Sequence, residues 1–328
     1  MANKFDSLTN LFICPVCKAE ISLAGQNQLV CKNSHVFNIH EDIPIFAPNP
    51  PSQFYEEWTY KMHLELSARA PFIDKIMYYL SERLGLSLRR EKFLKKALNG
   101  KKGFVLDVGC GAGRSFYRQI GPVIGVDIAM SALKDSRKIY PLVAQADVLN
   151  LPFQDNIFDF VVSTDMIGHI PAAEKDQLLK EMCRVLKPGG IMAHVIEADA
   201  NNLFYNFAKR DKDLFHKYFV IEISGHFGLE RAAETLNRFR ALGLKEEKVE
   251  LIYDLFVPLY DFLRFYGEGY QKKYPVVKFL ALMVKMLMKN RYVAFIADIK
   301  LGIFATIFEK FRDIRCAQDF GVVYRKAS

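Results

Sequence analysis

Short apolar segments alternate with polar, helix-like segments through the middle of the chain, beginning at residue 103. The apolar segments are rich in Val, Ile and Phe, which favour strands, and each is too short for a buried helix. Strands that alternate with helices predict an α/β fold, in which a parallel sheet carries helices on both faces. Five such strands are predicted within residues 103–109, 122–128, 141–147, 158–164 and 190–197, and two more at 248–252 and 319–325.

A long apolar segment, residues 254–318, separates the last two predicted strands. Within it, residues 276–291 predict one helix. Its Lys278, Lys285 and Lys289 share a narrow stripe, because each residue advances about 100° around the helix axis. Nearly all its other positions are apolar, so the helix either packs beneath other protein or lies on an apolar surface.

The beginning of the chain has a different pattern. Residues 1–47 are rich in turn-forming residues, and four prolines within residues 44–51 predict a boundary. Residues 54–99 then place apolar residues at helical spacing. We therefore predict an N-terminal unit, a helix-and-sheet domain, a helical insertion and a last strand of the sheet, over residues 1–50, 51–253, 254–318 and 319–328.

The composition is that of a folded protein whose basic charge is concentrated near one end. The chain has 328 residues, of which 51% are hydrophobic, which is enough for about two domains with sizeable cores. The net charge is +8. Residues 254–316 hold eleven basic and six acidic residues, whereas residues 1–50 hold three basic and four acidic ones. The positive charge therefore accompanies the apolar insertion.

Neither a secretory signal nor a membrane-spanning helix is predicted. The N-terminus, MANKFDSLTNLFICP, has no basic start followed by an apolar run, so a cytoplasmic protein is expected. Charged residues, among them Lys285 and Lys289, interrupt each apolar run before it reaches the roughly 18 residues that span a bilayer. Peripheral contact of the insertion with a membrane stays open.

The first predicted strand ends in a glycine-rich turn, VLDVGCGAGR at residues 105–114. After Asp107, glycines occupy alternate positions, Gly109, Gly111 and Gly113. Glycines let a backbone turn sharply and approach a ligand, and the helix that follows such a turn supplies amide donors. The second strand ends in Asp127, a carboxylate suited to a ribose diol. The pattern predicts a nucleotide-binding edge of the sheet.

This series of motifs, residues 103–197, resembles the class I S-adenosylmethionine (SAM)-dependent methyltransferases, in the branch of the ubiquinone and sterol methyltransferases. The resemblance implies a Rossmann-like, doubly wound sheet that binds SAM. LKPGG at residues 186–190 also matches the family. The cofactor-binding residues that we predict are Asp107, Gly109, Gly111, Gly113, Asp127, Ile128, Asp147, Val148 and Asp165.

Methyl transfer from a sulfonium needs chiefly an acceptor positioned in line in a site that excludes water. If the acceptor must lose a proton, the candidates lie near the ends of the fourth and fifth strands. His169 is the first choice because it occupies a histidine position seen in the family branch, and a purely structural role is its alternative. The other candidates are Asp165, His194, Glu197 and His226. The aromatic group Phe54, Tyr55, Trp58 and Tyr60 is either a lid over the cofactor or ordinary packing.

The N-terminal unit contains a candidate zinc site. Cys14 and Cys17 form one short pair, and Cys31 and His35 form a second pair after a hairpin-length loop. Thiolates with one imidazole suit zinc, and four protein ligands would close its coordination shell. A structural rather than a catalytic zinc is therefore predicted.

The zinc unit resembles the N-terminal zinc finger of the ribosomal RNA guanine-N1 methyltransferases, with CPVC at residues 14–17 and His35 followed by Phe37. RNA recognition favours basic residues around a finger, and residues 1–50 carry a net charge of −1. The expected acceptor is therefore a hydrophobic or lipid-like small molecule, and RNA is the alternative. The insertion is expected to cover the acceptor, form a dimer contact or contact a membrane surface. The sequence does not predict the oligomeric state.

Overall fold

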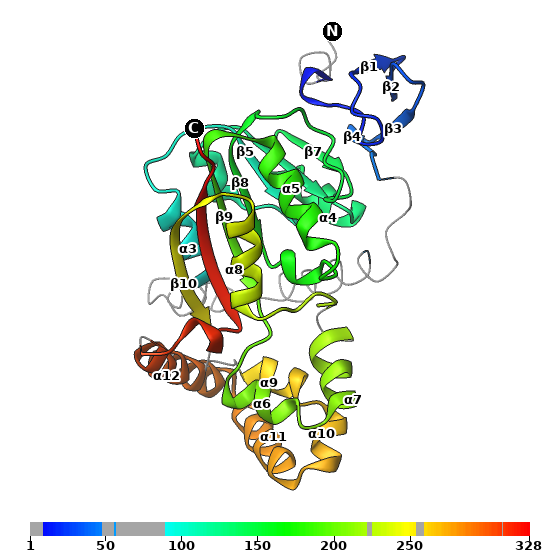
Figure 1. The fold of residues 1–328 in the computed structure, drawn as a ribbon. Helices are drawn as coiled ribbons and strands as arrows, with labels where there is room; N and C mark the ends of the chain where they lie inside the picture. The colour runs from blue at the N-terminus through cyan, green and yellow to red at the C-terminus, as the bar shows by residue number, and fades with distance from the viewer. Residues whose placement is uncertain (1–8, 48–55, 57–88, 222–224, 254–258, 310) are drawn as a thin grey trace.

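The structure is a computed structural model that describes residues 9–47, 56, 89–221, 225–253, 259–309 and 311–328. A seven-stranded sheet forms its centre (Figure 1). The strand order is β10-β11-β9-β8-β5-β6-β7, and only β11 runs antiparallel to its neighbours. All seven predicted strands are confirmed: β5 (Val105–Val108), β6 (Val123–Asp127), β7 (Leu142–Gln145), β8 (Phe158–Thr164), β9 (Leu186–Glu197), β10 (Lys245–Tyr253) and β11 (Asp319–Arg325).

Helices cover both faces of this sheet, which confirms the predicted α/β class. On one face, Leu179 of α5 and Phe239 of α8 belong to the larger core. On the other face, Phe93 of α3 and Leu133 of α4 belong to a second core. The two cores arise because strands buried on both sides are apolar at nearly every position. The helices are α3 (Arg89–Ala97), α4 (Met130–Ser136), α5 (Lys175–Val185) and α8 (Ala232–Ala241).

The N-terminal unit is a small antiparallel sheet that packs against the large one. Phe12 pairs with Phe153 in an isolated bridge, and their rings stack at 5.4 Å. Ile45 makes a second bridge to Gln145 at the end of β7. Phe12 is buried in the same core as β8 and α5, so the unit is fixed to the domain. Its strands are β1 (Ile21–Ala24), β2 (Gln28–Cys31), β3 (Val36–His40) and β4 (Ile43–Pro44).

The insertion between β10 and β11 is helical, as predicted, and lies at the lower end of the molecule in Figure 1. The single helix expected over residues 276–291 ends earlier, at Met288. Asn290 lies just after this end and caps the N-terminus of the next helix. Its side-chain oxygen accepts hydrogen bonds from the backbone N–H groups of Tyr292 and Val293. The helices are α9 (Leu259–Phe265), α10 (Glu268–Lys273), α11 (Pro275–Met288) and α12 (Arg291–Glu309).

An aromatic core joins the insertion to the segment that follows β9. Phe219 and Tyr270 are fully buried in it, and Tyr266 donates a hydrogen bond to the carbonyl of Phe204 at 2.7 Å. This core is separate from the two cores of the sheet, so the lower end is a satellite unit. The segment contributes α6 (Leu203–Ala208), α7 (Lys212–Phe215) and the π-helix η4 (His216–Ile221).

Lys175, at the start of α5, is fully buried and holds the loop before α8. Its ammonium donates to the carbonyl of Gly228 and lies 3.3 Å from a carboxylate oxygen of Glu230. Burial lowers the pKa of Lys175, and the charge of Glu230 opposes that shift. Arg238 holds the same carboxylate at 2.6 Å. The loop that carries His226 is therefore fixed by a buried ionic group.

Replacing Lys175 with Met is expected to lower the free energy of unfolding by about 2–3 kcal/mol, below the usual cost of breaking a buried pair because Arg238 still holds Glu230. The measurement is equilibrium unfolding in urea. Lys180→Met, on an exposed position of the same helix, is the matched control and should cost less than about 0.5 kcal/mol. Equal effects of the two changes would contradict the prediction.

Candidate active site

The glycine turn lies at the carboxyl end of β5, where all three glycines have positive φ, of +67°, +52° and +81°. A side chain at Gly109 would meet Met166, whose Cγ would lie 2.3 Å from the added Cβ. At Gly111, by contrast, an added Cβ would meet nothing within 4 Å. Packing and conformation therefore both require glycine at 109, while Gly111 leaves open space above the turn. This open space would let a ligand approach the backbone of the turn closely.

Asp127, the last residue of β6, links the glycine turn to the second strand. One carboxylate oxygen accepts a hydrogen bond from the N–H of Gly111 and the other from the N–H of Ala129, both at 2.9 Å. Burial raises the pKa of Asp127, and these backbone donors oppose that shift. Each carboxylate oxygen can accept a second bond, so Asp127 keeps the capacity to bind the two hydroxyls of a ribose.

Asp107 lies beneath the turn and is almost completely buried. The Tyr140 hydroxyl donates to it at 2.6 Å and accepts from the backbone N–H of Arg114 at 2.6 Å. Burial raises the pKa of Asp107 to about 6, although Tyr140 and the charge of Arg114 act in the other direction. Asp107 therefore braces the turn through Tyr140 and carries a negative charge near neutral pH.

The loops after β6 and β7 lie side by side because these strands pair in parallel, with Asp127 opposite Gln145. The side-chain amide of Gln145 donates to the carbonyl of Ile128 at 2.8 Å. Asp147 accepts from the backbone N–H of Leu149 at 2.9 Å, and Val148 is buried beside it. The structure thus brings Ile128, Asp147 and Val148 to the same edge as Asp127, where their predicted contacts with the base stay predictions.

Asp165 follows the end of β8 and belongs to a partly buried ionic group that the sequence did not reveal. Arg90 of α3 donates to Asp165 at 2.7 Å and to Asp319 at 2.6 Å. Burial raises the pKa of Asp165 to about 7, although the charge of Arg90 lowers it. Arg90 looked like one of many basic residues on a surface helix, and Asp319 like an ordinary strand start. No local pattern distinguishes either residue.

Glu197 ends β9 beside this group, in register with Asp319 of β11. One of its oxygens lies 3.4 Å from Nε2 of His226 and 4.0 Å from Nε2 of His169. Burial alone would raise the pKa of Glu197, but the hydrogen bond and charge of His226, with the charges of His169 and Arg90, lower it to about 2. His169, the predicted proton acceptor, thus faces a carboxylate, and its catalytic role stays a prediction.

His194 lies away from this edge, which argues against its place among the proton acceptors. Its ring is fully buried within β9, where Nδ1 lies 2.8 Å from the Ser163 hydroxyl. Burial lowers its pKa to about 3, so the ring is neutral. Successive side chains of a strand point to opposite faces of the sheet. His194 is three positions before Glu197, so its side chain points to the face opposite that of Glu197.

The expected aromatic lid, Phe54, Tyr55, Trp58 and Tyr60, lies outside the described residues. Glu56, from the same segment, is described and was not predicted. Its carboxylate accepts hydrogen bonds from the backbone N–H groups of Met130 at 2.8 Å and Ser131 at 3.1 Å, the first residues of α4. Glu56 therefore lies at the start of α4, next to the loop after Asp127.

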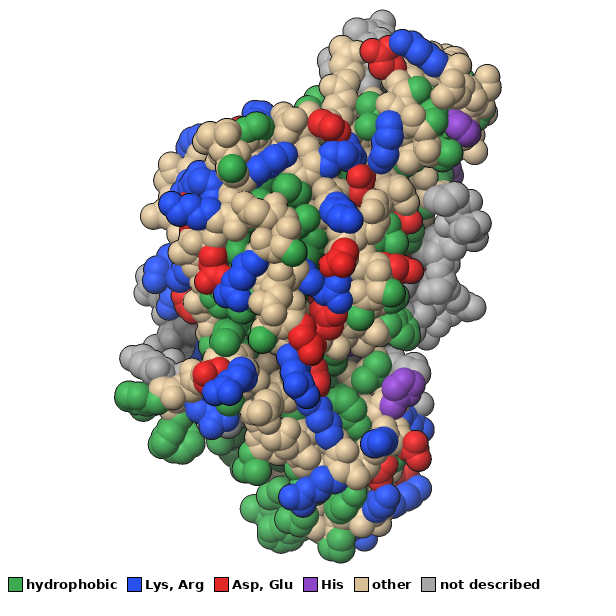
Figure 2. Space-filling view, viewed as in Figure 1, with side chains coloured by type: hydrophobic (Ala, Val, Ile, Leu, Met, Phe, Trp, Pro, Cys, Tyr) green, Lys and Arg blue, Asp and Glu red, His purple; other side chains and the backbone are tan. Residues whose placement is uncertain are grey.

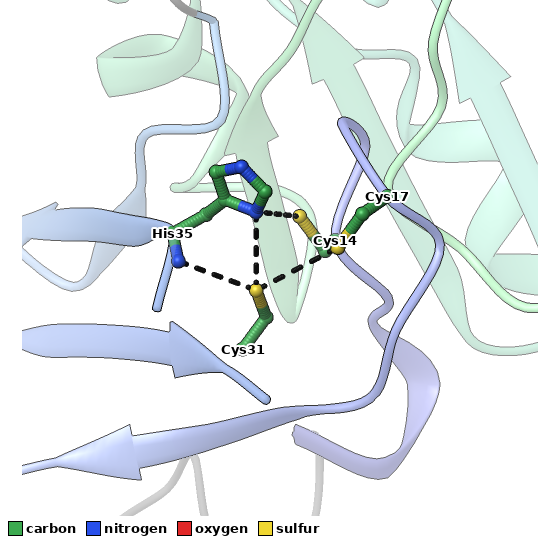
Figure 3. A group of neighbouring side chains, drawn as sticks. All are labelled: Cys14, Cys17, Cys31 and His35. Atoms are coloured by element: carbon green, nitrogen blue, oxygen red, sulfur yellow. Dashed lines mark hydrogen bonds between the residues drawn. The ribbon is translucent and has the colours of Figure 1, made fainter. Parts of the chain in front are cut away.

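The four predicted zinc ligands converge in the N-terminal unit (Figure 3). Sulfurs at 2.3 Å from one tetrahedral ion lie about 3.8 Å apart, and a sulfur and a nitrogen about 3.5 Å apart. Here Sγ of Cys17 and Cys31 lie 3.7 Å apart. Nδ1 of His35 lies 3.5 Å from Sγ of Cys14 and 3.3 Å from Sγ of Cys31. The donor set and its spacing fit tetrahedral Zn²⁺.

Comparisons with known proteins identify the family of this chain. A methyltransferase-domain family model matches residues 106–194, from β5 to β9. A demethylmenaquinone methyltransferase of Listeria monocytogenes is 32% identical over 186 residues, which cover 51% of this chain and 73% of that protein. The chain belongs to the class I SAM-dependent methyltransferases.

Two further similarities are more limited. A provisionally named methyltransferase of Encephalitozoon cuniculi is 40% identical to this methyltransferase over 94 residues, or 28% of this chain and 44% of that protein. Phosphoethanolamine N-methyltransferase 2 of Haemonchus contortus, solved with SAM, is 19% identical with a TM-score of 0.45. That similarity covers 73% of this chain and 52% of that one.

The residues of this edge fit SAM. The open space over Gly111 would accept the cofactor's close approach, and Asp127 would hold its ribose. Asp107 would supply negative charge beneath the methionine part, and Ile128 and Val148 apolar contact to the base. SAM carries an activated methyl group, so the remaining task of this chain is to position an acceptor beside it and exclude water.

Replacing Asp127 with Ala is expected to weaken SAM binding roughly 10- to 100-fold, because hydrogen bonds from the ribose to a charged group are lost. Isothermal titration calorimetry with SAM measures this. Asp135→Ala, an exposed aspartate of α4 that pairs with Lys138, is the matched control and should bind SAM normally. Unchanged affinity in Asp127→Ala would remove Asp127 from the cofactor site.

Proposed function

We propose that this methyltransferase transfers the methyl group of SAM to a hydrophobic, lipid-like acceptor that it takes from a membrane surface. The observation that carries the proposal is the exposed apolar surface of the insertion. Fifteen of the nineteen exposed large hydrophobic side chains of the described chain lie within residues 276–311. Figure 2 shows hydrophobic side chains gathered at the lower end of the molecule, over α11 and α12. Hydrophobic side chains that are exposed singly over a surface need no explanation. Their concentration on two helices indicates an interaction surface.

The circumference of α11 divides into three zones. Val277 and Ala281 are buried against the protein. Lys278, Lys285 and Lys289 are exposed and lie within about 40° of one another. The remaining face is apolar and exposed, with Val276, Phe279, Leu280, Met283 and Met286. An apolar face flanked by lysines is the pattern of a helix that lies in an anionic lipid interface.

The topology supports delivery from that surface to the site. β10 ends and β11 begins at the carboxyl edge of the sheet, where Tyr253 pairs with Asp319 and Asp319 with Glu197. The insertion therefore leaves the sheet at the same edge that carries the glycine turn. Arg89, next to Arg90, donates to the carbonyl of Ile252 at 2.8 Å, which fixes α3 to the end of β10. An acceptor held by the insertion would thus lie close to the predicted SAM site.

The relatives support the acceptor class. The Listeria protein is named as a demethylmenaquinone methyltransferase, and its name gives demethylmenaquinone as the acceptor. A quinol or similar lipid-like acceptor would use Glu197 and the neighbouring histidines on its polar head, while apolar side chains hold its tail. RNA is less favoured, because the N-terminal unit has a net charge of −1 and is packed against the sheet.

Localisation follows the same proposal. No helix in the described part of the chain is long and apolar enough to cross a membrane. With the apolar face of α11 on the bilayer surface, the enzyme would act on the cytoplasmic side as a peripheral protein that binds and leaves the bilayer.

We also propose that the N-terminal unit holds a structural Zn²⁺ through Cys14, Cys17, Cys31 and His35. The sulfur and nitrogen separations fit the ion, and four protein ligands leave no position for a substrate. The ion would stabilise a unit whose strands are short and whose own core is small, and through Phe12 it would support the edge of the main sheet.

Replacing Lys278, Lys285 and Lys289 with Gln is expected to weaken binding to anionic vesicles roughly 100-fold, because each lysine near such a surface contributes about 1 kcal/mol. Co-sedimentation with phosphatidylglycerol vesicles measures binding. Labelled methyl transfer from SAM into a cell lysate, followed by separation of lipid, RNA, protein and soluble fractions, measures the acceptor class. Label in the lipid fraction is expected.

The control for the lysine variant is Lys92→Gln, Lys96→Gln and Lys180→Gln, which removes the same charge from exposed positions on α3 and α5. It should bind vesicles normally, and both variants should bind SAM normally. Equal binding by the two variants would contradict the membrane surface. Label in RNA would overturn the lipid-like acceptor.

Replacing Cys14 with Ser is expected to abolish the bound zinc and lower the melting temperature by several degrees, because metal binding contributes to the folding free energy of this unit. Elemental analysis of protein purified under reducing conditions should find one zinc per chain in the wild type. Cys183→Ser, a half-buried cysteine of α5, is the control and should keep its zinc. A wild-type protein without zinc would exclude the proposal.

A further inference from the structure

A second group of metal-ligating side chains lies at the acceptor side of the sheet. Ligand atoms of His169, Glu197 and His226 all lie within 4.8 Å of one another. They come from three separate segments: the turn after β8, the end of β9 and the loop before α8. Two imidazoles and one carboxylate form a donor set that transition metals bind well.

The His169 ring is oriented as a metal ligand would be. Its Nδ1 lies 2.9 Å from the carbonyl of Gly225, and a carbonyl only accepts, so Nδ1 is the donor. In the neutral ring, the lone pair is then on Nε2, the nitrogen that faces Glu197 at 4.0 Å. Metal-binding histidines characteristically donate their other N–H to a backbone carbonyl or carboxylate in this way.

Glu197 provides the second, independent observation. The residue is only 6% exposed, and its oxygen Oε2 is buried without a hydrogen-bond partner in the described part of the chain. Buried polar atoms are nearly always satisfied, and a carboxylate can bind a cation through both oxygens, so the unsatisfied Oε2 points to a missing cation. Gly168 lets the carboxylate of Glu197 lie close to the backbone, because a Cβ added at Gly168 would lie 2.9 Å from Oε2.

The spacing is close to that of a coordination shell. Ligand atoms about 2.1 Å from one ion at a tetrahedral angle lie about 3.4 Å apart. Nε2 of His226 and Oε1 of Glu197 are 3.4 Å apart already. The 4.0 Å between Nε2 of His169 and Oε1 would need to shorten by about half an ångström, which a side-chain rotation supplies.

We propose that His169, Glu197 and His226 bind a divalent transition-metal ion, separate from the N-terminal zinc. Three protein ligands leave one or more coordination positions open, which is the arrangement of a site that binds a substrate rather than a structural site. Asp319 is paired with Glu197 in the sheet, and Asp165 shares Arg90 with Asp319, so both aspartates lie at the same edge as the proposed site. The ion would hold an oxygen of the acceptor, an assignment that rests on the proposed function, whereas the metal site itself does not.

Cobalt distinguishes the two metal sites of this chain. Full-length protein with its zinc is dialysed against Co²⁺, and bound metals are measured by elemental analysis and by visible absorption. We expect one zinc and one cobalt per chain. The cobalt should show weak ligand-field bands without the intense thiolate-to-metal band that a cysteine site would produce.

Glu197→Gln and His226→Ala should each lose the cobalt and keep the zinc, with Co²⁺ affinity at least about tenfold weaker. His216→Ala, an exposed histidine of η4, controls for adventitious binding and should keep both metals. SAM binding and the unfolding midpoint identify any variant that fails to fold. Because metal content is measured without an acceptor, this test gives its result even if lipid methylation is not found.

Absence of a second metal in the wild type would overturn the proposal, as would full cobalt binding in both Glu197→Gln and His226→Ala. His169 would then remain the predicted proton acceptor beside Glu197. A thiolate band from the cobalt would also overturn it, since the ion would then occupy the cysteine site.

Discussion

The ion pair of Arg90 with Asp165 and Asp319 is the interaction on which the acceptor side depends. It joins α3, the exit of β8 and the start of β11, which are far apart in sequence. The side chain of Asp319 is only 7% exposed, so loss of Arg90 would leave that charge without compensation, and the bridge holds the three elements together. Because Asp319 is in register with Glu197, the same bridge also fixes the end of β9. The position of Glu197 relative to His169 and His226 thus depends on an ion pair that includes neither histidine.

The reversed strand β11 explains where the insertion lies. β10 runs parallel to the central strands and ends at their carboxyl edge, and β11 begins there and runs back. Any segment between them must leave and return at the edge where parallel strands place ligand-binding loops. The aromatic core of Phe219 and Tyr270 then stabilises that segment independently of the sheet. The insertion therefore has a core of its own, separate from the two cores that support the glycine turn and the predicted SAM site.

Much of this architecture is predictable because local patterns in the sequence specify it. Apolar runs identified all seven strands, glycine spacing identified the turn, and cysteine spacing identified the cluster of Cys14, Cys17, Cys31 and His35. The surroundings of Glu197 were not predictable, because His226 and the charge of Arg90 come near it only through tertiary packing. His194 was assigned to the wrong surroundings because position along a strand, not residue type, decides which face a side chain takes. The helix predicted over residues 276–291 was too long. Asn290 caps the next helix, although apolar residues continue at helical spacing beyond it.

The charge of α11 bears on what covers its apolar face. A second copy of this chain, related by a two-fold axis, would bring the same surface against itself and place the stripe of Lys278, Lys285 and Lys289 near its own copy. Like charges in such a contact repel, whereas an anionic lipid surface attracts all three lysines. The exposed Phe and Met side chains would add about 1 kcal/mol or more each on partial burial. Contributions of this size give reversible binding, which suits the proposed function, in which the enzyme would collect its acceptor from lipid and exchange SAM with water.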